Sequence, residues 1–178
     1  MAAGRRFTRK QAIVAGGVAA AAAGGGAAAV VLTRDGDEGG EAVAGDYPRL
    51  AVARLGVIQP GEPVSFEYPL TGQQSLLIDL DQEVPEGVGD KKSIVAYSIL
   101  CQHMGCPVQY VQDGGYFLCP CHQSKYDPAR EGFVIQGVAM TPLPRIQLEV
   151  DGEDVFAVGV SGLIYGYREN LAPGEKVA

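Results

Sequence analysis

The fold of this chain is decided by two short stretches, CQHMGCP at residues 101–107 and CPCHQSKYD at residues 119–127. Together they contain all 4 cysteines and both histidines of the 178-residue chain. Taken singly, a cysteine is usually a small buried apolar side chain and a histidine a hydrogen-bonded polar one. The gathering of every such residue into two matching stretches predicts a metal or redox centre instead.

Several kinds of site use cysteine and histidine, and the spacing separates them. Haem attachment needs Cys-x-x-Cys-His, whereas Pro120 alone stands between Cys119 and Cys121. A thioredoxin-like redox pair needs Cys-x-x-Cys in a βαβ setting, and the sequence offers neither. A structural zinc site of two cysteines and two histidines would leave two cysteines without a role. An all-cysteine [2Fe–2S] site would leave both histidines idle, so a cluster with mixed cysteine and histidine ligands uses the set best.

The pattern Cys-x-His-x-x-Cys followed by Cys-x-Cys-His-x-Ser resembles that of the Rieske [2Fe–2S] proteins. The resemblance implies four cluster ligands, with two thiolates on one iron and two imidazoles on the other: Cys101, Cys119, His103 and His122. It also implies a disulfide between Cys106 and Cys121. Two neutral imidazoles in place of thiolates remove negative charge, which raises the reduction potential above that of all-cysteine ferredoxins.

The resemblance also implies roles for residues beside the ligands. Ser124 and Tyr126 match positions whose hydroxyls donate hydrogen bonds to cluster sulfurs. The alternative is that Ser124 is simply a turn residue and Tyr126 a core residue. Gly105 is expected where the backbone needs an unusual conformation or a close approach. The segment TPLP at 141–144 stands where a third, proline-bearing loop covers the cluster, or is a plain connector.

The rest of the body predicts antiparallel β structure. With 25 Gly and 11 Pro, the composition favours short strands and turns over helical bundles. Alternating or compact apolar runs predict strands near 64–68, 75–80, 93–100, 116–118, 133–136, 146–150 and 154–160. Asp151-Gly152 predicts a hairpin turn between the last two. The expected fold class is all-β, with Rieske-type stacked antiparallel sheets and a cluster-binding part at about 98–144.

The N-terminal region differs from the body in charge. Residues 1–33 hold four basic side chains and no acidic one, and 11–32 are uncharged. This layout predicts a helical segment that is either a twin-arginine-like export signal or a membrane anchor. Residues 34–46 are Gly-rich and charged, as in a flexible linker, and 47–178 form the Rieske domain. We therefore expect export in the folded state to the periplasm or the extracytoplasmic face of the membrane. The chain's net charge of -7 disfavours nucleic acid as a partner.

Further segments resemble the Rieske small subunit of arsenite oxidase, among them GEPV at 61–64, IVAYS at 94–98 and GLIYG at 162–166. That resemblance implies a heterodimer with a large molybdopterin and iron–sulfur subunit, and a cytochrome c or small copper protein as acceptor. No residue of this chain is expected to perform substrate chemistry. Tyr126 instead matches the quinol-oxidising cytochrome bc Rieske proteins, since phenylalanine is common there in arsenite oxidases. A Rieske subunit of a quinol:cytochrome c oxidoreductase and a free-standing Rieske-type ferredoxin therefore stay open.

Overall fold

The computed structural model describes residues 46–172 and residue 177. The expected signal or anchor at 1–33 and residues 34–45 of the expected linker lie outside the described residues. Among the helices of the described residues, none is long and apolar enough to cross a membrane.

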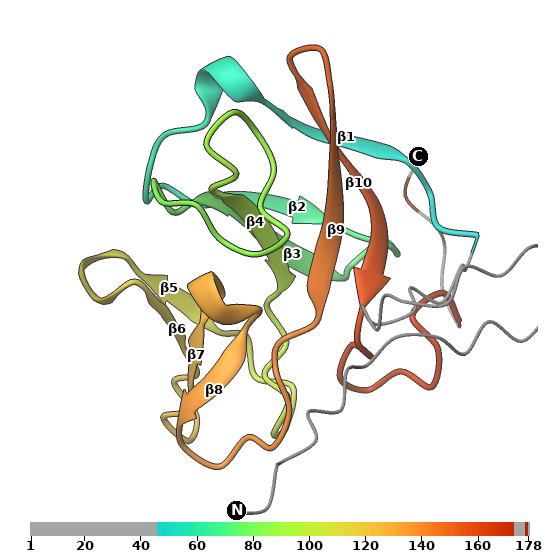
Figure 1. The fold of residues 1–178 in the computed structure, drawn as a ribbon. Helices are drawn as coiled ribbons and strands as arrows, with labels where there is room; N and C mark the ends of the chain where they lie inside the picture. Colours follow the sequence, from blue (N-terminus) through green and yellow to red (C-terminus); the bar gives the residue numbers. More distant parts are fainter. Residues whose placement is uncertain (1–45, 173–176, 178) are drawn as a thin grey trace, which may run out of the picture. The chain divides into compact units, whose positions relative to one another are not determined.

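The described residues form two antiparallel sheets and three short 3₁₀ helices, which confirms the expected all-β fold (Figure 1). The larger sheet has six strands in the order β1-β10-β9-β4-β3-β2. Its strands are β1 (Leu50–Arg54), β2 (Val64–Glu67), β3 (Gln74–Asp79), β4 (Ile94–Ser98), β9 (Arg145–Asp151) and β10 (Asp154–Ser161). Strands β1 and β10, the first and the last within the described residues, are therefore neighbours.

The smaller sheet has four strands in sequence order, each paired with the next. They are β5 (Gln109–Val111), β6 (Tyr116–Leu118), β7 (Lys125–Asp127) and β8 (Phe133–Gln136). The 3₁₀ helices are η1 (Leu55–Val57), η2 (Gln112–Gly114) and η3 (Pro128–Arg130). The two cysteine and histidine stretches flank the first pairing of this sheet: 101–107 precedes β5, and 119–124 connects β6 to β7.

The smaller sheet is an insertion between two strands of the larger one. The strands β4 and β9 are adjacent, with Ala96 opposite Ile146. The backbone N–H of Ser98 donates to the carbonyl of Pro144 at 2.9 Å, so the chain leaves and re-enters the larger sheet at neighbouring points. Residues 99–144 lie between these points and include every predicted cluster ligand.

Strand β4 joins two apolar cores because all five of its residues are buried. Successive strand residues face opposite sides of a sheet. On one side, Ala96 packs with the core of the larger sheet. On the other, Val95 and Tyr97 pack with Phe117 of β6, and the rings of Tyr97 and Phe117 meet edge to face at 5.7 Å. This second core also contains Cys101 and Cys119, at 1 % exposure each, so it anchors the predicted site.

The strands predicted from apolar patterns all form, with the hairpin turn at Asp151-Gly152. Three strands were not expected: β1, β5 and β7. Strands β5 and β7 have three residues each and carry polar side chains, including Lys125 and Asp127. Short polar runs have no apolar alternation of their own, and these two are held by pairing with β6.

Candidate metal centre

Two tight loops carry the predicted ligands: loop 1, residues 101–107, and loop 2, residues 119–124. In loop 1 the N–H of Cys101 donates to the carbonyl of Cys106 at 3.0 Å, and the N–H of Gly105 donates to the carbonyl of Cys101 at 2.8 Å. Gly105 has φ of +72°, a left-handed conformation that side chains disfavour. In loop 2 the N–H of Cys119 donates to the carbonyl of Ser124 at 2.8 Å. Each loop is thus closed by its own backbone.

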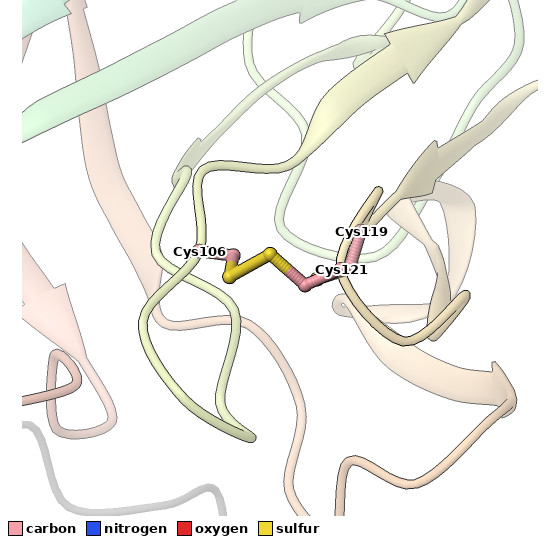
Figure 2. Close-up of side chains that lie close together, drawn as sticks. All are labelled: Cys106, Cys119 and Cys121. Atoms are coloured by element: carbon pink, nitrogen blue, oxygen red, sulfur yellow. A yellow bond between two sulfur atoms is a disulfide. The ribbon is translucent and has the colours of Figure 1, made fainter.

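A disulfide joins the two loops, as the family resemblance implied. It links Cys106 of loop 1 to Cys121 of loop 2, with an S–S distance of 2.05 Å (Figure 2). Cys106 is half-buried and Cys121 is exposed. The bridge therefore fastens the two loops together at the rim of the site, while Cys101 and Cys119 remain free thiols in the interior.

The sulfur atoms of Cys106, Cys119 and Cys121 all lie within 4.8 Å of one another. They do not make a ligand set on their own. Iron binds thiolates, and the sulfurs of Cys106 and Cys121 are already bonded to each other. Only Cys119 of the three offers a thiolate, so a metal at this place needs donors from elsewhere in the two loops.

Cys101 supplies the second thiol. The side chains of Cys101 and Cys119 lie in the same buried core, close enough for each thiol to affect the other. Burial raises the pKa of the Cys119 thiol, and the contact with Cys101 raises it further, although the backbone N–H groups of Cys121 and His122 act in the opposite direction. Two adjacent buried thiols ionise together only if a cation compensates their charge, and a bound metal deprotonates a coordinating thiol. The pair therefore fits one iron of a cluster.

The two histidines face each other across the loops. The Nδ1 atoms of His103 and His122 are 3.2 Å apart, and the ring planes meet at 86°. His103 is half-buried and His122 is exposed. Two converging imidazole nitrogens near solvent, and two thiols in the interior, are the donors that a Rieske-type [2Fe–2S] cluster requires. The residues present fit the group.

The hydroxyl of Tyr126 is directed at the interior thiol pair. Its oxygen is 3.1 Å from Sγ of Cys101, and it accepts the backbone N–H of Gln102 at 3.0 Å. Tyr126 is fully buried. Burial raises the pKa of its hydroxyl, and the contact with Cys101 raises it further. Tyr126 therefore stays neutral, and towards a thiolate at Cys101 it can only donate.

Ser124 connects loop 2 to the third loop, residues 137–144. Its fully buried Oγ accepts the N–H groups of Val138 and Ala139, both at 3.2 Å. Because these bonds use its lone pairs, its own proton is free to donate to a sulfur atom. Residues 138–139 thus bind the third loop to loop 2, and the role of 141–144 as a cover of the cluster stays a prediction.

Two residues contribute to the site without having been expected from the sequence. Gln102 supplies the N–H that orients the Tyr126 hydroxyl. Gly137 has φ of +101°, and a Cβ there would stand 2.5 Å from Cα of Ser124. Only glycine lets the third loop come this close to loop 2. A glycine directly after the apolar run at 133–136 indicates a turn, whereas no sequence pattern indicates that Gln102 contributes to the site.

Comparisons with known proteins agree with this geometry. The family model of the Rieske [2Fe–2S] domain matches residues 49–147. A protein named iodate reductase subunit IdrB, from Denitromonas iodatirespirans, is 41% identical over 135 residues, covering 74% of this chain and 73% of the relative. Its namesake from Pseudomonas sp. (strain SCT) is 37% identical over 130 residues, covering 71% and 68%.

Two further relatives are similar to this chain, one over a smaller part of its length and one at lower identity. The cytochrome bc1 complex Rieske iron–sulfur subunit of Streptomyces lividans is 42% identical over 96 residues, covering 49% of this chain and 55% of the relative. Among solved structures, the soluble domain of Rieske protein II from Sulfolobus acidocaldarius superposes with a TM-score of 0.60 at 28% identity. It covers 70% of this chain and 85% of that domain.

Proposed function

Because the chain belongs to the Rieske [2Fe–2S] family and carries a Rieske-type cluster, we propose that it is the electron-transfer subunit of an oxidoreductase complex whose partner subunit converts the substrate. The cluster supplies a one-electron redox couple. In this proposal Cys101 and Cys119 hold the inner iron, and His103 and His122 hold the outer one. The Cys106–Cys121 disulfide keeps the two ligand loops together.

One observation carries the electron-transfer role: the histidine pair converges beside solvent while the thiol pair is buried. An electron carrier needs a short path from its redox centre to the surface of a partner, and the imidazole edges provide one. Exposed apolar side chains stand on the loops nearby, with Met104 of loop 1 at 60% and Met140 of the third loop at 90% exposure. Such side chains suit a protein partner that excludes water from the contact.

The substrate of the complex is proposed to be an inorganic oxyanion. The segments at 61–64, 94–98 and 162–166 resemble the small subunit of arsenite oxidase. Oxidation of arsenite releases two electrons, so a partner centre must hold the pair and pass electrons singly to this chain. We propose a large molybdopterin and iron–sulfur subunit for that role, with a cytochrome c or a small copper protein as final acceptor.

Iodate reduction is the second candidate, favoured by a specific observation. Two relatives named iodate reductase subunits share 41% and 37% identity with this chain over more than two thirds of their own length. In an iodate reductase the electrons would flow through this chain towards the partner subunit and not away from it. The same ligand loops serve either direction, because a one-electron centre accepts and donates at the same atoms.

We place the complex at the extracytoplasmic face of the membrane. A structural disulfide is typical of oxidising compartments, and the basic and then apolar sequence of residues 1–33 favours export. A Rieske subunit of a quinol:cytochrome c oxidoreductase has less support, since the Streptomyces lividans subunit matches over 49% of this chain.

Purification of the native complex tests these proposals. The expected result is a heterodimer that contains molybdenum and iron, in which arsenite reduces the Rieske cluster only when the partner subunit is present. Oxidation of the reduced cluster by iodate, without any response to arsenite, would instead establish the iodate reductase. A His103→Ala variant should stop transfer to cytochrome c and leave arsenite-driven reduction of the partner's own centres intact. Cytochrome b without molybdenum in the purified complex would overturn the oxyanion proposal.

A further inference from the structure

The segment that follows β10, residues 162–170, contacts loop 1 through one aromatic ring. A Cβ placed on Gly105 would lie 2.6 Å from Cδ1 and 2.9 Å from Cε1 of Tyr165. The ring therefore rests directly on the Cα of Gly105. Gly105 lies between His103 and Cys106, so the contact falls on the turn that carries a proposed ligand.

The ring is held in this place by the buried parts of its own segment. Ile164 is fully buried in the core of the larger sheet. The side chain of Asn170, at 8% exposure, accepts the N–H of Ile164 at 2.9 Å and donates to the carbonyl of Gly162 at 2.8 Å. It also donates to the hydroxyl of Tyr47 at 3.2 Å. Asn170 thus joins the end of the segment to its beginning, at 162–164, and also binds it to Tyr47 near the start of the domain.

The tip of loop 1 needs support of this kind. The disulfide at Cys106 and the bond from the Cys101 N–H fasten the base of the loop. His103 and Met104 lie beyond these points, and Met104 is 60% exposed. The tip is closed by the N–H of Gly105, which donates to Cys101, and is covered by the Tyr165 ring.

We propose that Tyr165 is a positioning residue of the redox centre: its ring fixes the tip of loop 1 and, through it, the imidazole of His103. The inference rests on the proposed ligand set and deepens it. Two features of this contact require glycine at position 105. Its positive φ makes the turn, and the absence of a side chain leaves room for the ring of Tyr165. Within residues 46–172 the Tyr165 hydroxyl makes no hydrogen bond, so the ring alone does the positioning.

Removal of the ring should leave the cluster present but its outer ligand less well fixed. In a Tyr165→Ala holoprotein we expect a broadened EPR signal of the reduced cluster, since a mobile imidazole samples several orientations. We also expect cluster loss to a chelator to be about tenfold faster, the lower end of what outer-shell substitutions cost a metal site. A Tyr165→Phe variant should match the wild type in both measurements, because it keeps the ring.

Two further variants separate positioning from general destabilisation. Leu163→Ala truncates a half-exposed neighbour on the same segment and should leave the EPR line shape unchanged. Asn170→Asp removes both donated hydrogen bonds of the segment and should broaden the signal as Tyr165→Ala does. If Tyr165→Ala were to lose its fold, a Tyr165→Leu variant, which retains apolar bulk without the flat ring, would be measured in its place with an intermediate effect expected.

A double variant tests the direct contact. Gly105→Ala places a methyl group against the ring, so Tyr165→Ala should be far less harmful in that background than in the wild type. Additive effects would overturn the positioning role. An unchanged EPR line shape and cluster lifetime in Tyr165→Ala would do the same while leaving the ligand set intact. A wild-type signal without mixed cysteine and histidine ligation would overturn the proposed ligand set, a distinguishable result.

Discussion

Replacing Tyr126 by phenylalanine should lower the reduction potential of the cluster without loss of iron. The hydroxyl lies 3.1 Å from Sγ of Cys101 and is oriented by the N–H of Gln102 at 3.0 Å. A hydrogen bond donated to a cluster-bound sulfur strengthens when an electron adds negative charge, so it stabilises the reduced state. Phenylalanine fills the same buried space and removes only the donor.

The size of the shift follows from hydrogen-bond energies. A bond to a charged acceptor contributes about 2 kcal/mol and one to a neutral acceptor about 1 kcal/mol, so we take about 1 kcal/mol as the difference between the oxidation states. A tenfold change in equilibrium, about 1.4 kcal/mol, corresponds to about 59 mV for one electron. The potential of the Tyr126→Phe variant should therefore fall by about 40 mV.

The measurement is a potentiometric titration of the holoprotein, followed by the EPR signal of the reduced cluster. Tyr97→Phe is the matched control. Tyr97 is equally buried in the same core, and its hydroxyl donates to the carbonyl of Pro128 at 2.8 Å. That variant should lose about 1 kcal/mol of stability and keep its potential. An unchanged potential in Tyr126→Phe, or an equal fall in Tyr97→Phe, would refute the reasoning.

Three more predictions concern the same loops. The reduced protein should give an EPR signal with the low average g value of mixed ligation, whereas a zinc-loaded, EPR-silent protein would contradict the cluster. Peptide mapping without reductant should find Cys106 joined to Cys121, and a free Cys106 in untreated holoprotein would count against the structure. Ser124→Ala should lower the potential, because the Oγ proton is free to donate to sulfur, and should loosen the third loop by freeing two N–H groups. Its control is Ser75→Ala, a buried serine of β3 that lies outside the ligand loops, for which titration should show no shift.

The resemblance to the Rieske pattern implied the disulfide, and local apolar patterns predicted the main strands. Cys106 and Cys121 stand at fixed places in two motifs, and the apolar alternation at 146–150 needs no knowledge of the rest of the fold. The substrate of the complex left no such pattern. The residues that set it belong to the partner in our proposal, and resemblance to arsenite oxidase and identity with iodate reductase subunits favour different answers.

What the sequence could not show depends on contacts between distant residues. The N–H of Gln102 is a backbone group, and every residue but proline has one, so its bond to Tyr126 was not visible beforehand. The Tyr165 ring meets Gly105 only because the segment after β10 comes back to loop 1, 60 residues earlier in the sequence. Gly105 was expected to need a special backbone or a close approach, and the structure shows that it has both.

The junction at β4 and β9 makes the redox part of this protein a transplantable module. Residues 99–144 begin and end at hydrogen-bonded neighbours, Ser98 and Pro144, so a different insert could be grafted there without altering the pairing of the larger sheet. Natural variation could therefore retune the potential within the insert while the larger sheet keeps its strand order. The Tyr165 contact sets a limit on such exchange, because an incoming loop must offer a glycine to the ring it will meet.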